Sequence, residues 1–168
     1  WWRWPWFWTP ALAMPPDYGD APDAPYRSLA WRSGASHGIW WYEWLGPGRD
    51  GEWDSHQVDR DRHDDGVTVA PLAGTVTFTP TVAYPWNIGR YSSMTPLHVH
   101  GWVDWNRDGD WRDADEWLVN WSGCPGQVGV WPVGQPSLGV THPFVLPSGV
   151  FGTHDLITLW LRFRLDYA

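Results

Sequence analysis

The strongest constraint on the fold is a two-residue alternation of apolar and polar side chains in the second half of the chain. In the segment 156–165, LITLWLRFRL, alternate residues from Leu159 to Leu165 are apolar and share one face of an extended strand. Strands are also expected at 67–70, 75–82, 97–105, 117–121 and 127–131. Pro and Gly separate these runs, and no stretch shows a helical period. The sequence therefore predicts an all-β protein, an antiparallel β-sandwich or jelly roll.

The length of 168 residues is sufficient for one domain with a hydrophobic core. We expect residues 17–168 to form this domain and residues 1–16 to form a separate leader. No run of 18 apolar residues is present, so no segment is expected to span a membrane. Cys124 is the only cysteine, which excludes an internal disulfide.

Most of the acidic residues lie in three stretches, 17–23, 50–65 and 104–116, and the net charge of the chain is −8. This charge argues against nucleic acid as a partner, because binding to a phosphate backbone needs clustered Lys and Arg. Crowded carboxylates repel one another unless a cation or water separates them. The three stretches therefore favour hard divalent cations, which prefer oxygen ligands.

The stretch 103–116, VDWNRDGDWRDADE, has the spacing of the first half of an EF-hand calcium loop, with Asp104 at position 1 and Gly109 at the sharp turn. Its second half differs, because position 12 is Asp115 and the glutamate follows one residue late. The flanks alternate like strands, so we expect a calcium site in a strand–loop–strand context. Its expected ligands are Asp104, Asn106, Asp108 and the carbonyl of Asp110, with Asp113 or Glu116 closing the shell. The alternative is an acidic hairpin tip held by Asx-turns.

The other two acidic stretches carry weaker signals for metal binding. The segment DYGDAPD (17–23) is equally consistent with a series of turns, and the segment 49–66 with a solvated loop. Two stretches could also share one ion. The candidate ligands of a second calcium site are Asp17, Asp20, Asp50, Glu52, Asp61, Asp64 and Asp65.

Five segments follow one another in an order known from a protein family: DYGDAPD (17–23), LGPGRDGEWDSHQ (45–57), DRHDDGV (61–67), GWVDWNRDGDWRDADE (101–116) and LRFRL (161–165). In this order they resemble the GEVED domain, a module of secreted bacterial surface proteins, over residues 17–165. The acidic motif that usually follows the last strand of the family is not present, and the leader lies outside the family pattern. The resemblance implies a calcium-binding β-sandwich that acts as an extracellular building or adhesive module without catalysis.

The leader, WWRWPWFWTPALAMPP, combines prolines, which favour extended geometry, with tryptophans at alternate positions. In an extended segment Trp2, Trp4, Trp6 and Trp8 share one face, which the segment cannot bury alone. Binding in a membrane interface usually needs several cations, and disordered linkers are usually poor in aromatic residues. We favour a strand that is donated to the sheet edge of another copy, which would produce a head-to-tail filament.

Other patterns carry weaker functional signals. The pair His98 and His100 could bind zinc or copper, but exposed strand histidines are the simpler interpretation. Paired carboxylates could cleave glycosides, but acids in this polar loop are poorly suited to stay protonated, so no enzyme is expected. Asn120 begins an N-x-S glycosylation sequon.

These observations predict a structural subunit of an extracellular fibre or pilus-like appendage, stabilised by calcium and joined to copies of itself. The alternative function is a calcium-dependent adhesin module that binds carbohydrate through exposed tryptophans.

Overall fold

The computed structural model describes residues 16–19, 21–34, 36–37, 43–48, 54, 66–82, 96–124, 127, 130, 135–147 and 159–167. Within these ranges the protein is built from antiparallel strands and two 3₁₀ turns, η1 (Ala30–Arg32) and η2 (Pro71–Ala73). The predicted all-β antiparallel class is therefore confirmed. None of the helical segments in the described part of the chain is long and apolar enough to cross a membrane.

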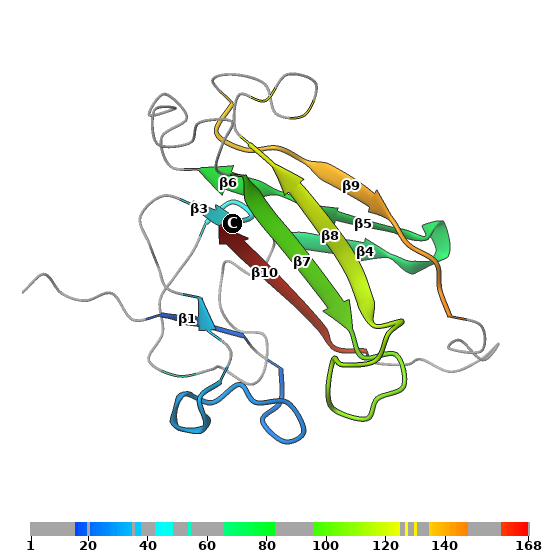
Figure 1. The fold of residues 1–168 in the computed structure, drawn as a ribbon. Helices are drawn as coiled ribbons and strands as arrows, with labels where there is room; N and C mark the ends of the chain where they lie inside the picture. The colour runs from blue at the N-terminus through cyan, green and yellow to red at the C-terminus, as the bar shows by residue number, and fades with distance from the viewer. Residues whose placement is uncertain are drawn as a thin grey trace, which may run out of the picture.

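Two three-stranded sheets face each other and enclose the core (Figure 1). One sheet has the order β4-β5-β9, from β4 (Val67–Ala70), β5 (Thr75–Phe78) and β9 (Val140–Pro143). The other has the order β10-β7-β8, from β10 (Leu161–Tyr167), β7 (Leu97–Val103) and β8 (Trp117–Gly123). Because every strand pairing within these sheets is antiparallel, short hairpins can connect neighbouring strands.

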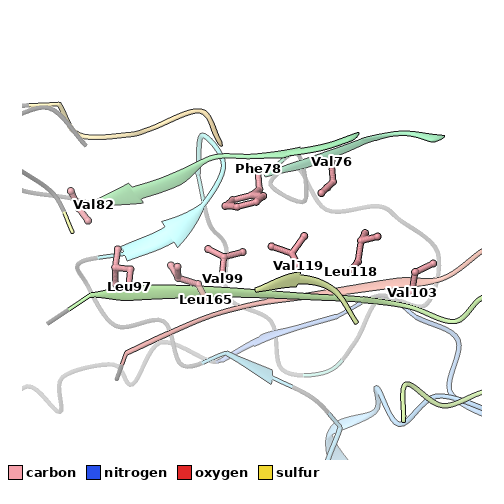
Figure 2. Close-up of a cluster of buried hydrophobic side chains, with 9 residues drawn as sticks. All are labelled: Val76, Phe78, Val82, Leu97, Val99, Val103, Leu118, Val119 and Leu165. Atoms are coloured by element: carbon pink, nitrogen blue, oxygen red, sulfur yellow. The ribbon is translucent and has the colours of Figure 1, made fainter. Parts of the chain in front are cut away.

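Two further pairs of short strands complete the described structure. β1 (Asp17–Tyr18) pairs with β2 (Ser36–His37), and β3 (Glu43–Leu45) pairs with β6 (Pro80–Val82). In the close-up, β1 and β2 lie on the side of the β10-β7-β8 sheet that faces away from the core (Figure 2).

The core lies between the two sheets and is filled by side chains at alternate strand positions. Along β7, Leu97, Val99 and Val103 are buried, while the intervening side chains point away from the core. Figure 2 shows these residues facing side chains from the other half of the sandwich, among them Phe78, which is fully buried. In β7 the period of two in the sequence is thus the burial pattern of the strand, whereas β6 and β8 contain consecutive buried residues.

The predicted strand at 67–70 is β4, with the same ends. The predicted strands at 97–105, 117–121 and 156–165 correspond to β7, β8 and β10, with shifted ends. The predicted strand 75–82 is divided into β5 and β6 at Thr79. The amide of Thr79 donates to the carbonyl of Gly66 at 3.0 Å, and its carbonyl accepts from the amide of Gly46 at 2.7 Å. The chain therefore changes its pairing partner from β4 to β3 at this residue.

The prediction of a strand at 127–131 is wrong at its two described residues. The amide of Gln127 donates to the carbonyl of Cys124, and the amide of Val130 donates to the carbonyl of Gln127. Hydrogen bonds at this three-residue spacing form turns and leave no ladder for a neighbouring strand. β3 and β9 were not predicted, because their short segments become strands only by pairing with β6 and β5.

Candidate metal centre

The loop between β7 and β8 carries the predicted calcium motif, and its two ends are held together. The amide of Val103 donates to the carbonyl of Glu116 at 2.9 Å, and the amide of Asp104 donates to the carbonyl of Trp160 at 3.2 Å. The strand pairing therefore places Asp104 and Glu116 side by side at the base of the loop, although the loop separates them in sequence.

Three acidic side chains of this loop form a compact group. Asp104, Asp108 and Glu116 each offer a carboxylate oxygen, and these oxygens lie within 4.8 Å of one another. Asp104 is 0% exposed and Glu116 is 1% exposed, whereas Asp108 is exposed. The group has a buried base that solvent can approach from the side of Asp108, and it could hold a metal ion. A group with only oxygen ligands suits a hard cation.

The carboxylate of Asp104 is fixed by four hydrogen bonds. Its Oδ1 accepts from the amides of Arg107 and Asp108 at 2.5 and 3.2 Å. Its Oδ2 accepts from the amide of Gly109 at 3.0 Å and from the hydroxyl of Tyr26 at 2.5 Å. Arg107 and Gly109 have φ angles of 63° and 91°, which turn these amides towards Asp104. The loop is therefore wound around the carboxylate that begins the motif.

The tip of the loop consists of consecutive Asx-turns. Asn106 Oδ1 accepts from the amide of Asp108 at 2.9 Å, and Asp108 Oδ1 accepts from the amide of Asp110 at 3.0 Å. Asp110 Oδ1 accepts in the same way from the amide of Arg112 at 2.9 Å. The Asx-turns that we considered as the alternative to a calcium site are thus part of the structure. These turns alone do not require an ion.

Glu116 is the residue that the Asx-turns do not explain. Its Oε2 accepts from the amide of Asp113 at 3.2 Å, but its Oε1 is buried and receives no hydrogen bond from the described residues. Burial raises the pKa of Glu116 to about 6; the Asp113 amide opposes this, and the charges of Asp104, Asp113 and Asp108 add to it. A buried carboxylate oxygen without a partner is unfavourable, and a cation next to it would compensate.

The structure brings together three of the six ligands predicted for the first site. Asn106 lies beside the group, and its Nδ2 donates to Asp108 Oδ2 at 3.2 Å and to Asp113 Oδ2 at 2.6 Å. The carboxylates of Asp110 and Asp113 are exposed and lie outside the group. Of the two residues expected to close the shell, Glu116 is the one that faces Asp104 and Asp108.

The predicted second site falls almost entirely outside the described residues. Only the backbone of Asp17 is described, in β1, where it pairs with His37. The other six candidates are not among the described residues: Asp20, Asp50, Glu52, Asp61, Asp64 and Asp65. The same holds for the leader tryptophans Trp2, Trp4, Trp6 and Trp8.

Tyr26 belongs to the surroundings of the site and was not found from the sequence. It is 4% exposed, its hydroxyl binds Asp104, and its ring stacks on Trp111 with a centroid separation of 4.6 Å and an interplanar angle of 23°. Its position in the chain, far from the loop, contains no signal for this contact. Only the folded arrangement of the N-terminal segment brings it to the site.

The two strand histidines lie on the face of β7 that points away from the core. The rings of His98 and His100 are parallel, with centroids 6.0 Å apart, and they belong to no acidic or histidine group that could hold a metal within the described ranges. The side chain of Asn120 is exposed on β8, as a glycosylation site requires.

Comparison of the chain with protein-family models, with curated proteins and with solved structures gave no significant match.

Proposed function

We propose that this protein is a non-catalytic structural module of an extracellular assembly, in which a calcium ion closes the β7–β8 loop. The observation that carries the proposal is the buried, unpartnered Oε1 of Glu116 beside the carboxylates of Asp104 and Asp108. Three carboxylates this close repel one another at neutral pH, and a divalent cation converts the repulsion into attraction.

Calcium suits the site better than other common cations. The group offers only oxygen ligands, and amide and carbonyl oxygens of Asn106 and Asp110 lie on the same loop at the alternate positions that calcium loops use. Magnesium demands a tighter octahedral geometry and retains more of its water. The resemblance to the GEVED domain supports the same ion.

The proposed role of the ion is mechanical. It would join the two ends of the β7–β8 loop, at Asp104 and Glu116, and so stiffen one end of the sandwich. Many small extracellular domains obtain this kind of cross-link from disulfides, which a chain with one cysteine cannot form within itself. An ion with a structural role needs no open coordination position for a substrate.

Removal of calcium is expected to lower the melting temperature of the protein. Calcium at 100 times its dissociation constant stabilises a protein by roughly 2.7 kcal/mol, which corresponds to roughly 5–10 °C for a chain of this size. The measurement is a thermal melt, followed by circular dichroism, of protein dialysed against EDTA and then supplied with calcium, with magnesium as the control ion. An identical melt in EDTA and in calcium would contradict the proposal.

The leader is proposed to connect copies of the module by adding a strand to the sheet of a neighbour. Among the described strands, β8 lies at one edge of its sheet, and an edge strand can accept a further strand. Deletion of residues 1–16 is therefore expected to give folded monomers, measured by light scattering and electron microscopy beside the full chain. Filaments formed equally well by the truncated protein would rule out this mode of assembly.

The second candidate function is calcium-dependent binding of carbohydrate. Among the described residues, two tryptophans are exposed, Trp31 at 77% and Trp117 at 54%, and exposed aromatic rings are suited to stacking on sugars. A glycan array probed with and without calcium separates this function from a purely structural one.

A further inference from the structure

The N-terminal segment 23–32 is organised around one carboxylate of its own. Asp23 accepts hydrogen bonds from the amides of Ser28 and Leu29 at 3.3 and 3.1 Å, and it forms an ion pair with Arg32. The segment ends in the short turn η1, whose first amide donates to the carboxylate of Asp54 at 2.7 Å. It is therefore a closed loop with its own internal support, and η1 ties it to Asp54.

This segment meets the sandwich at the β7–β8 loop. The hydroxyl of Tyr26 donates to Asp104, and the ring of Tyr26 stacks on Trp111. Pro25 packs so closely on Gly109 that a Cβ atom at Gly109 would lie 2.1 Å from the Cβ of Pro25. Three residues of the loop thus form the surface that receives Pro25 and Tyr26.

The positions of Asp104, Gly109 and Trp111 depend on the conformation of the loop around the three grouped carboxylates. Asp104 is one of the three grouped acids, Gly109 donates its amide to Asp104, and Trp111 follows directly after Asp110 at the loop tip. Repulsion between the three carboxylates disfavours this closed form of the loop and, with it, the receiving surface. With a cation, the loop is held in the form that fits the segment.

We propose that docking of the segment 23–32 onto the sandwich is coupled to cation binding, with Tyr26 as the positioning residue that holds Asp104 in its ligating orientation. This inference rests on the proposed function, since it requires the ion. Coupling between two binding events is reciprocal, so the docked segment strengthens cation binding as much as the cation strengthens docking.

Hydrogen–deuterium exchange of the full chain tests the coupling. Calcium is expected to slow exchange of the segment 23–32 and of the loop 104–116 relative to EDTA, with little change in β5 and β7. The second measurement is a calcium titration of Tyr26→Phe, which keeps the ring and removes the hydroxyl. Loss of a group that orients a ligand typically weakens metal affinity by roughly tenfold or more, and we expect an effect of this size.

The control variant is Trp31→Ala, in the same segment, because its side chain is 77% exposed and its ring lies against Arg32, which is not part of the surface that receives Pro25 and Tyr26. It should retain the calcium affinity of the natural chain. If the natural chain binds calcium but exchange of residues 23–32 does not respond, or if Tyr26→Phe binds calcium as tightly as Trp31→Ala, the coupling is disproved and the calcium site stands. If the natural chain does not bind calcium, the coupling and the proposed function both fail.

Discussion

The variant Glu116→Gln is expected to lose its response to calcium and to be more stable than the natural protein in the absence of calcium. Calcium affinity depends on the number of charged ligands, and removal of one of the two buried charges of the group should weaken it by roughly 100-fold or more. In the metal-free protein the same change removes a buried charge that faces two other carboxylates. The measurements are a calcium titration and thermal melts in EDTA and in calcium.

The pKa of Glu116 explains why Glu116→Gln should be more stable than the natural protein in the absence of calcium. Burial raises this pKa from 4.5 to about 6, so the folded metal-free protein binds the proton more tightly than the unfolded chain does. Ionisation of Glu116 therefore costs nothing below pH 4.5, begins to destabilise the fold as the pH rises from 4.5 to 6, and destabilises it fully above pH 6. The full cost is about 2 kcal/mol. Without calcium, the difference in stability between Glu116→Gln and the natural protein should grow over this pH range.

The matched control is Asp115→Asn, which removes one charge at the neighbouring position. Asp115 is exposed, lies outside the carboxylate group, and occupies the position that an EF-hand register would assign to the closing ligand. It should change calcium affinity only slightly. If Asp115→Asn abolishes binding while Glu116→Gln does not, the ligand register proposed for this loop is wrong.

Replacement of Phe78 by alanine is expected to be the most destabilising single change in the core. Phe78 is fully buried on β5, between the two sheets (Figure 2). Its ring meets Trp121 edge to face, with ring centroids 5.6 Å apart. Truncation of a buried phenylalanine leaves a cavity and typically costs about 3–5 kcal/mol. Denaturant unfolding in the presence of calcium measures the loss, which is a large part of the stability of an ordinary domain.

Leu72→Ala provides the comparison for an apolar side chain outside the core. Leu72 lies in η2 and is fully exposed, so its truncation should change the free energy of unfolding by less than about 0.5 kcal/mol. Equal losses for Phe78→Ala and Leu72→Ala would mean that Phe78 does not lie between two packed sheets.

In the β7–β8 loop, local sequence predicts some features of the candidate site and not others. The spacing of Asp104, Asn106, Asp108 and Gly109 predicts an oxygen-rich turn, because the conformation of such a turn is set by residues a few positions apart. The choice between Asp113 and Glu116 as the closing residue could not be made in this way. It depends on the pairing of β7 with β8, which places the carbonyl of Glu116 on the amide of Val103.

The sequence by itself determined the class of the fold and the location of the acidic loop, because two-residue alternation and turn spacing are local properties of the chain. Only the tertiary structure decided which strands become neighbours, where the strand 75–82 is divided, and that Tyr26 reaches Asp104. These contacts join residues distant in the chain and depend on burial and shape, which local patterns do not encode. The burial of Glu116 Oε1 without a hydrogen-bond partner also depends on the tertiary structure, because a carboxylate loses its water partners only when the fold closes around it.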